Sequence, residues 1–300
     1  MTMKKYTFKK IDAFATQNSA GNPAGVIYLD SLDDISDKEM LTIAQQLSGF
    51  VSEVGFVEKH DENTFKLRYF SAEREVDFCG HATIAIMYDV IKSDAKLLKQ
   101  SQLTVVTTKN TLSVENKILN DEAVFITSPA PVFRDIELDL QYIASLLDID
   151  SHQIDQNKPI EVVDAGLTTL VLPIKTLDAI LSVSPNLASL NDFCLTIGVD
   201  IITLFSAQTY DKSNAYRTRV FTPTFGYLED PATGAGNAAF GHYLLKNNLW
   251  QIGAMTIEQN GIVDQANIIK LVACQVDDSN IQVAFGGAAV VRLSGQYFLQ

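Results

Sequence analysis

Alternating hydrophobic and polar positions run through much of the chain and predict a protein rich in short strands. The clearest case is the run Phe-Lys-Leu-Arg-Tyr-Phe at residues 65–70, in which every second side chain is apolar. This alternation is typical of a strand with one buried face. Similar alternation or short apolar runs predict further strands at residues 5–16, 26–29, 52–58, 102–107, 111–115, 123–127, 160–163, 169–173, 201–206, 219–223 and within 255–300.

Fewer segments repeat apolar residues at helical spacing. Residues 37–47 do so, and Asp37 is the predicted N-cap of that helix. Residues 82–91 predict a helix that is apolar on most sides, and such a helix belongs in a core. Turn chemistry interrupts the pattern at Gly21-Asn22-Pro23. Other helices are predicted at residues 139–147, 185–197 and 238–245.

One motif, a strand followed by a glycine and a helix, occurs twice in the chain. Residues 77–83 read Asp-Phe-Cys-Gly-His-Ala-Thr, and residues 230–237 read Asp-Pro-Ala-Thr-Gly-Ala-Gly-Asn. In each copy an arginine-bearing strand, with Arg68 or Arg219, leads into a turn, a glycine and a helix of small and apolar residues. The spacing differs by three residues, which we place around Gly226. The repeat predicts two related halves, and we expect a site built from both.

The order of these elements favours an α+β fold. Strands cluster around one buried helix per half instead of alternating strictly with helices, which argues against a doubly wound sheet. Pro129 and Pro131 interrupt the chain after the strand at 123–127. We therefore predict a domain transition there, with domains at residues 1–128 and 129–287.

Composition narrows the class of protein. The 300 residues are 47% hydrophobic and 20% charged, as in soluble globular proteins. A formal charge of −13 argues against a nucleic-acid or anionic-membrane partner, but leaves room for an anionic small substrate. We see no secretory signal and no apolar stretch of the ~20 residues that a membrane-spanning helix needs. The three cysteines are widely spaced without a CxxC pair, so we expect a cytoplasmic protein with neither disulfides nor a zinc site built from cysteines.

Cys79 and His81 are the first candidates for chemistry. Cys79 lies where a helix is expected to start, and backbone N–H groups there favour an anion, either a thiolate or a substrate carboxylate. On sequence alone, the favoured interpretation of Cys79 is a small buried hydrophobe. His81 suits proton transfer because the ordinary pKa of histidine is close to neutrality, but a capping or core role explains it as well.

Two acidic residues are further candidates. Glu53 begins an apolar strand, and apolar walls raise the pKa of a carboxylate toward the range of a general acid or base. From the residues alone, an exposed strand-end glutamate is the favoured interpretation of Glu53. Asp230 can cap the second helix, hold a substrate amine or orient His81. A dinucleotide site at Gly234-Ala235-Gly236 is rejected, because no βαβ unit surrounds these glycines.

Several motifs together resemble the phenazine-biosynthesis PhzF-like proteins, which share the diaminopimelate epimerase fold. The resemblance spans almost the whole chain, and the pair Asp-Phe-Cys-Gly-His-Ala-Thr and Glu-Asp-Pro-Ala-Thr-Gly is highly specific. The residues that carry it are Phe14 through Gly21-Asn22-Pro23, Ser52-Glu53 with Phe56-Val57, residues 77–83, Phe221-Thr222-Pro223, residues 229–234 and Gly286-Gly287.

The resemblance implies two pseudo-symmetric domains, each a barrel-like wrap of strands around a central helix, with a cleft between them. A last strand at about 288–300 is expected to return to the first domain. It also implies a homodimer and cofactor-free proton transfer at carbon in a small carboxylate-bearing metabolite, without a metal. Glu53 matches the catalytic glutamate. The expected substrate-binding residues are Asn22, Cys79, Gly80, His81, Asp230, Thr233, Gly234 and Ala235.

Two departures from the related patterns bear on the substrate and the mechanism. Ala235 stands where PhzF-like proteins usually have a serine, so the substrate can differ from the phenazine precursor. Diaminopimelate epimerases use two cysteines, but Thr233 stands where the second would be, and threonine is too weak an acid for that role. We therefore favour an isomerase that depends on Glu53. The alternatives are a non-catalytic binding protein with the same fold and an epimerase or lyase that depends on Cys79.

Overall fold

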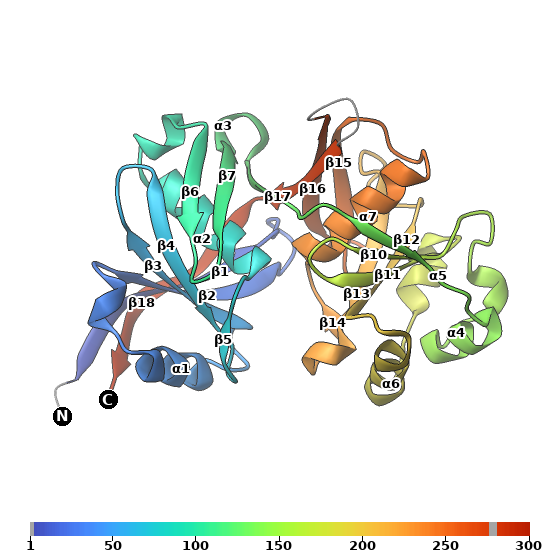
Figure 1. Ribbon diagram of the computed structural model, residues 1–300, viewed down its shortest axis with the longest axis horizontal. Helices are drawn as coiled ribbons and strands as arrows, with labels where there is room; N and C mark the ends of the chain where they lie inside the picture. The colour runs from blue at the N-terminus through green and yellow to red at the C-terminus, as the bar shows by residue number, and fades with distance from the viewer. Residues whose placement is uncertain (1–2, 276–280) are drawn as a thin grey trace. The chain divides into compact units, whose positions relative to one another are not determined.

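The computed structural model describes residues 3–275 and 281–300 and divides the chain into two compact units (Figure 1). The first unit comprises residues 1–126 and 286–300, and the second comprises residues 127–285. The C-terminal strand thus belongs to the same unit as the N-terminal strand. Each unit combines many strands with one long buried helix, so the α+β prediction is confirmed.

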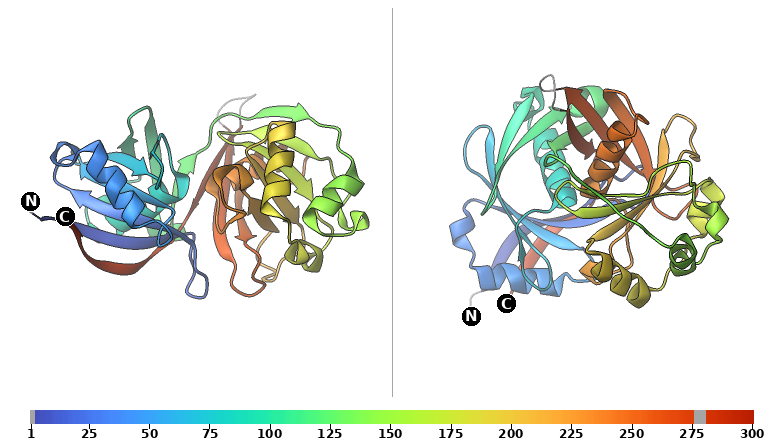
Figure 2. Two further views of the ribbon diagram at one scale, coloured as in Figure 1. Left: turned by 90° about the horizontal axis from the view of Figure 1, so that it is seen from below. Right: turned by 45° about the vertical axis from the view of Figure 1, so that its right-hand side comes forward.

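The first unit is built mainly from antiparallel strands. Its strands are β1 (Lys4–Ala13), β2 (Asn22–Leu29), β3 (Glu53–Lys59), β4 (Thr64–Phe70), β5 (Glu75–Val76), β6 (Gln102–Val106), β7 (Thr111–Lys117), β8 (Ala123–Thr127) and β18 (Ala289–Leu299). Two parallel pairs, β2 with β3 and β4 with β6, interrupt the antiparallel order. Strand β18 pairs with β1 along its whole length, and Figure 2 shows the two ends of the chain side by side.

Helix α2 (Gly80–Ser93) is the centre of the first unit. It contacts β1, β2, β3 and β18, and most of its side chains from Ala82 to Ile91 are buried. The apolar character that predicted a core helix is therefore confirmed. The remaining helices of this unit are α1 (Asp37–Gln46), the four-residue α3 (Ile118–Asp121) and the 3-10 turns η1 (Leu32–Asp34) and η2 (Leu97–Lys99).

The second unit repeats this plan around helix α7 (Gly234–Lys246), which contacts β10, β11, β12 and β16. Parallel pairing occurs between β11 and β12 and between β13 and β15, as in the two parallel pairs of the first unit. Its strands are β9 (Val132–Asp135), β10 (Glu161–Asp164), β11 (Thr168–Pro173), β12 (Ile201–Ser206), β13 (Tyr216–Phe221), β14 (Glu229–Asp230), β15 (Gly253–Gln259), β16 (Asn267–Gln275) and β17 (Ile281–Gly287). The other helices are α4 (Leu140–Leu147), α5 (Leu177–Ser182), α6 (Leu187–Ile197), η3 (Ser151–Gln153) and η4 (Pro223–Phe225).

An arginine–glutamate pair marks the repeat in three dimensions. In the first unit Arg68 donates to Glu75 through Nε at 2.8 Å and Nη2 at 2.7 Å. In the second, Arg219 donates to Glu229 in the same bidentate way at 2.9 and 2.7 Å. Both glutamates pair across the turn with a phenylalanine of the arginine strand. The three extra residues of the second copy lie in this turn, at η4 and Gly226, as the sequence predicts.

Three local predictions need correction. Helix α1 is capped by Ser36, which forms a reciprocal capping box with Glu39, and Asp37 is its first helical residue. Strand β2 begins at Asn22, so Pro23 lies inside a strand and the turn ends at Gly21, whose φ is +69°. Proline fits there because it is near the start of the strand, where one missing N–H does little harm. Helix α5 and strand β9 were not predicted, since both are short.

Candidate active site

The start of α2 carries the reactive side chains of the first unit. Cys79 is the N-cap residue and makes no side-chain cap, so the sequence-based placement of the helix start is confirmed. Its carbonyl accepts hydrogen bonds from the Thr83 N–H at 3.0 Å and the Thr83 hydroxyl at 2.7 Å. The buried Tyr69 hydroxyl lies 2.6 Å from the same threonine oxygen. This chain of hydroxyl groups holds the backbone of Cys79 in place at the start of α2.

Glu53 reaches this helix start because β3 packs closely against α2. A Cβ atom at Gly55 would lie 2.4 Å from Cδ1 of Ile86, so glycine permits the close approach of strand and helix. Glu53 is the first residue of β3, two positions before this contact, and is partly buried. The strand therefore delivers a carboxylate to the end of α2 at which Cys79 and His81 lie.

Glu53, Cys79 and His81 form one cluster of side chains. The His81 Nε2 atom lies 3.2 Å from Glu53 Oε2, and the Cys79 Sγ atom lies 3.9 Å from the same oxygen. The sulfur is also 3.5 Å from His81 Nδ1. The His81 and Glu53 side chains are 12% and 19% exposed, so small molecules can reach a cluster that is otherwise buried. The sequence predicted all three residues, but not that both ring nitrogens of His81 would have a partner.

Burial decides the charge of His81. Loss of hydration lowers the pKa of His81 to about 4, so the ring is neutral near pH 7. A neutral ring has one N–H, which allows two consistent proton arrangements. In one, Nε2–H donates to the Glu53 carboxylate while Nδ1 accepts from the Cys79 thiol. In the other, a protonated Glu53 donates to Nε2 and Nδ1–H faces a thiolate. Either arrangement orients the Glu53 carboxyl group.

The second unit has the equivalent helix start with different chemistry. Thr233 is the N-cap of α7, again without a side-chain cap. Its hydroxyl donates to the carboxylate of Asp230, a buried residue at the end of β14. Asp230 thus binds the side chain of Thr233, and Thr233 instead of Asp230 occupies the N-cap position of α7. Asn237 donates to the Thr233 carbonyl at 2.9 Å, which is the counterpart of the Thr83 contact in α2.

The side chain of Gln259 binds the N-terminus of α7, and no pattern in the sequence indicated this residue. Its Oε1 accepts from the Thr233 N–H at 2.9 Å and from Asn237 Nδ2 at 2.6 Å. Its Nε2 donates to the Asp230 carbonyl at 2.8 Å and to the Thr233 hydroxyl at 3.2 Å. Gln259 is fully buried, 26 residues after Thr233, and no local motif signals a contact over that distance.

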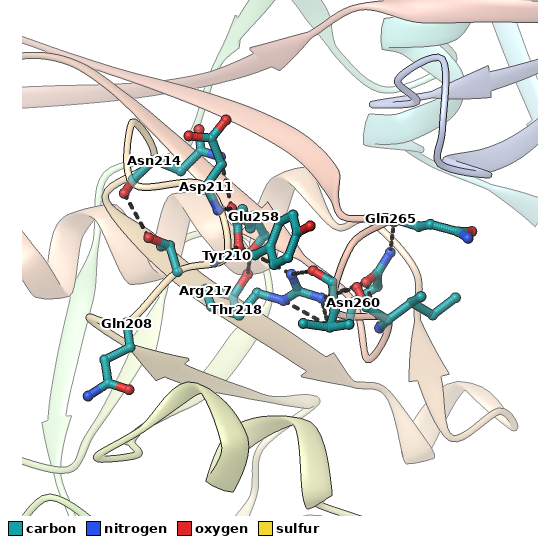
Figure 3. Close-up of polar contacts among 12 residues, drawn as sticks. Gln208, Tyr210, Asp211, Asn214, Arg217, Thr218, Glu258, Asn260 and Gln265 are labelled. Atoms are coloured by element: carbon teal, nitrogen blue, oxygen red, sulfur yellow. Dashed lines mark hydrogen bonds and ion pairs between the residues drawn. The ribbon is translucent and has the colours of Figure 1, made fainter.

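A buried ion pair anchors both neighbours of Gln259 (Figure 3). Glu258 lies 3.2 Å from Arg217 and accepts from the backbone N–H groups of Tyr210 and Asp211 at 3.0 and 2.8 Å. Arg217 also donates to the carbonyl and the side chain of Asn260 at 2.8 Å each. These contacts fix the end of β15, and with it the position of Gln259.

The other expected site residues lie in these two regions. Gly234 follows Thr233, and a Cβ atom there would lie 2.3 Å from the ring of Phe285, so this position requires glycine. Ala235 is the next residue of α7 and is partly buried. Gly80 is the first residue of α2. Asn22 is a buried residue that starts β2, two positions before the residue that pairs with Glu53.

Strand register identifies what replaces Glu53 in the second unit. Val54 pairs with Phe70 in the first unit, and Ile202 pairs with Phe221 in the second. The residue that precedes each is Glu53 in one case and Ile201 in the other. The second unit therefore has Ile201, Thr233 and Ala235 where the first has Glu53, Cys79 and His81.

Comparison with known proteins decides the family. A family model described as phenazine biosynthesis-like protein matches residues 11–295. The chain belongs to this phenazine biosynthesis-like family. The resemblance inferred from the motifs is therefore confirmed. An uncharacterized isomerase of Clostridium acetobutylicum is 27% identical over 304 residues, covering 99% of each chain.

Solved structures agree with this phenazine biosynthesis-like assignment. The crystal structure of the Bacillus anthracis phenazine biosynthesis protein of the PhzF family has a TM-score of 0.86 at 24% identity, with 99% of each chain covered. A hydroxyproline epimerase from Agrobacterium vitis has a TM-score of 0.62 at 11% identity, covering 100% of this chain and 93% of its own, and shows a related fold. The epimerase-like fold is confirmed, and the protein is an enzyme of the isomerase type. Within the described residues, no helix is long and apolar enough to cross a membrane.

Proposed function

We propose that the protein is a cofactor-independent isomerase that moves a proton between two carbons of a small carboxylate-bearing metabolite. Glu53 is the general base and then the general acid. Its carboxylate takes a proton from an activated C–H bond, and the electron pair delocalises into the adjacent unsaturated group. Glu53, whose carboxyl proton exchanges with solvent, then delivers a proton to another carbon. Atoms and charge balance without any further reactant.

One observation carries this proposal. Glu53 has a neutral imidazole 3.2 Å from its carboxylate, while the equivalent strand position in the other unit is Ile201. Thr233 likewise replaces the second thiol of a two-base epimerase. Because a proton shift needs only one group that both takes and returns the proton, the chemistry of a single carboxylate supports it better than a two-base racemisation.

Substrate binding is assigned to the two helix starts. Neither Cys79 nor Thr233 caps its helix through its side chain, so backbone N–H groups near Gly80 and Gly234 can bind a carboxylate. The further proposed substrate contacts are His81 and Asn22 in the first unit. In the second unit they are Asp230, Thr233 and Ala235. We also propose that the enzyme is cytoplasmic and homodimeric; sedimentation of the purified protein tests the dimer.

Solvent deuterium incorporation tests the proposed role of Glu53. Metabolite mixtures are incubated with the enzyme in D2O, and mass shifts identify compounds that exchange. Glu53→Gln should lower the exchange rate by roughly 10²–10⁴-fold while far-UV circular dichroism stays unchanged. Glu58→Gln removes a carboxylate from the other end of the same strand and serves as the matched control. Exchange retained in Glu53→Gln would sink the proposed role.

The pair of Cys79 and His81 supports one alternative, a thiol-dependent epimerase. A sulfur 3.5 Å from an imidazole nitrogen can become a thiolate base. Under this alternative, Cys79→Ser abolishes exchange and Glu53→Gln has the weaker effect. Under our proposal the order of the two effects is reversed. Ligand binding without exchange in the wild type would instead favour a binding protein.

A further inference from the structure

Glu53, Cys79 and His81 present three metal-binding donor atoms in one triangle. The separations are 3.2 Å for Nε2 and Oε2, 3.9 Å for Sγ and Oε2, and 3.9 Å for Sγ and Nε2. In a tetrahedral zinc site with ordinary bond lengths, the corresponding edges are ~3.3 Å between nitrogen and oxygen and ~3.5 Å to sulfur. The separations are thus within a few tenths of an ångström of these edges. Because Sγ lies nearer Nδ1, at 3.5 Å, the imidazole ring would also have to turn to direct the Nε2 lone pair at an ion held by all three side chains.

The chemistry of the donors selects the metal. One thiolate, one imidazole and one carboxylate are a borderline-soft set that suits Zn²⁺, whereas Mg²⁺ and Ca²⁺ prefer oxygen ligands alone. A thiolate and a carboxylate together neutralise the charge of the ion. The helix N-terminus at Cys79 favours the thiolate, which is the ligating form. The sequence criterion of paired cysteines overlooks this site because it contains a single cysteine.

We propose that Glu53 Oε2, Cys79 Sγ and His81 Nε2 form a Zn²⁺ site, with a fourth position open to water, and that zinc bound there switches the enzyme off. The inhibition by zinc rests on the proposed function, since a carboxylate that ligates zinc cannot accept a proton from carbon. Binding releases the thiol proton to solvent. The equivalent positions of the second unit carry Ile201, Thr233 and Ala235, none of which is a suitable ligand. Each chain would therefore bind one ion, at the cluster of Glu53, Cys79 and His81.

Direct titration tests the site without any substrate. Metal-free protein is titrated with Zn²⁺ against a chromophoric chelator, and with Co²⁺ to follow thiolate-to-metal charge-transfer absorption. The expected result is one ion per chain and a cobalt–thiolate band. Cys79→Ser should abolish the band. Cys79→Ser and His81→Gln should each weaken zinc binding by roughly a hundredfold, which corresponds to the binding free energy that one ligand contributes in a typical zinc site. Excess Mg²⁺ should not compete.

Matched variants separate this site from surface binding. Cys274→Ser removes an exposed thiol, and His60→Gln removes an exposed histidine beside Glu58. Both should leave stoichiometry and affinity unchanged. Zinc binding with unchanged affinity in Cys79→Ser, or loss of binding in Cys274→Ser, would overturn the proposal. Circular dichroism of each variant checks that the fold is intact.

The regulatory half of the proposal is tested by deuterium exchange. Zinc should inhibit exchange in the wild type and in Cys274→Ser in proportion to occupancy of the site, and a chelator should restore the rate. Exchange that persists at full occupancy would refute inhibition while leaving the site in place. Zinc binding in a protein without any exchange activity would refute the proposed function and not the metal site. Exchange in a protein that binds no zinc would refute only the metal site.

Discussion

The starts of α2 and α7 share a backbone and differ in chemistry. In each, a side chain one turn along the helix holds the N-cap carbonyl: the Thr83 hydroxyl in α2 and the Asn237 amide in α7. Around α2 lie a carboxylate, a thiol and an imidazole, whereas the equivalent positions around α7 carry Ile201, Thr233 and Ala235. The comparison teaches that different side chains keep the geometry of the repeat. The positions of Glu53, Cys79 and His81 carry no titratable group in the second copy, where the carboxylate near the helix start is that of Asp230, bound to Thr233.

Removing the arginine of each arginine–glutamate pair should lower the free energy of unfolding by unequal amounts. The Arg219 side chain is 9% exposed and also donates to the backbone carbonyl groups of Ile180 and Val183, whereas the Arg68 side chain is 17% exposed and contacts the exposed Asp37. We expect Arg219→Met to lower the free energy of unfolding by about 3–5 kcal/mol, because it leaves a partly buried carboxylate and carbonyls without a donor. Arg68→Met should cost about 1–2 kcal/mol.

Urea unfolding followed by circular dichroism measures both losses. The fluorescence of Trp250, the single tryptophan, reports separately on the second unit. Equal losses in the two variants would show that burial does not distinguish the pairs.

Buried histidines should make the folded state sensitive to acid. His242 of α7 is buried, and loss of hydration lowers its pKa to about 4. Its Nε2 lies 3.0 Å from the Ser128 hydroxyl, which itself donates to the Val283 carbonyl, so the ring nitrogen must be the donor. Between the ordinary pKa of about 6.5 and the folded value, the unfolded chain binds a proton that the folded chain does not. Stability is therefore full above pH 6.5, falls by at most about 3 kcal/mol toward pH 4, and falls no further below it on this account.

Replacing this histidine isolates its contribution. His242→Gln should flatten the stability profile between pH 6.5 and 4 relative to wild type, as measured by urea unfolding at each pH. His152→Gln removes an exposed ring and is the control. His81 of the first unit has a similarly lowered pKa, so His81→Gln should flatten the same window. An unchanged slope in His242→Gln would exclude the buried ring as a cause of acid sensitivity.

The starts of α2 and α7 should also differ in how much stability a single side chain contributes to each. Gln259 makes four hydrogen bonds to the start of α7. Gln259→Leu leaves several buried groups without partners and should cost about 2–3 kcal/mol. Thr83→Val at the start of α2 removes one hydroxyl, and the buried Tyr69 hydroxyl loses that partner. Because the Cys79 carbonyl keeps its bond from the Thr83 N–H, the cost should be about 1–2 kcal/mol. Denaturant midpoints of the two variants give the ratio, and a larger loss in Thr83→Val would contradict it.

Local patterns in the sequence predicted the features that depend on neighbouring residues. Apolar spacing predicted α2, and the glycine after Cys79 predicted where this helix begins. The strand at Ile201–Ser206 was predicted with its observed ends, because a short run of apolar residues is bounded by polar ones. Glu53, Cys79 and His81 were predicted as candidates because their motifs are local.

Contacts between distant segments could not be predicted in this way. Gln259 looks like any polar residue at a strand end, and only the pairing of β15 beside β13 brings it to Thr233. Pro23 suggests a turn, but the antiparallel pairing of β2 with β1, in which Pro23 lies opposite Asp12, keeps it in a strand. The two partners of His81 depend on how closely β3 approaches α2, which is set by the packing of Gly55 against Ile86.

Substitutions at Gly234 and Gly55 test the comparison of the two units with the smallest expected effects. Each glycine allows close packing between a central helix and a neighbouring strand. A methyl group at Gly234 would meet the ring of Phe285 at 2.3 Å, and the ring cannot move without disturbing buried neighbours. At Gly55 the methyl group would meet the flexible end of Ile86. Gly234→Ala should therefore cost about 1–2 kcal/mol, and Gly55→Ala less than about 1 kcal/mol. Phe285→Leu should relieve part of the Gly234→Ala penalty in a double-mutant cycle measured by urea unfolding, and strict additivity of the two changes would show that the ring is not the obstacle.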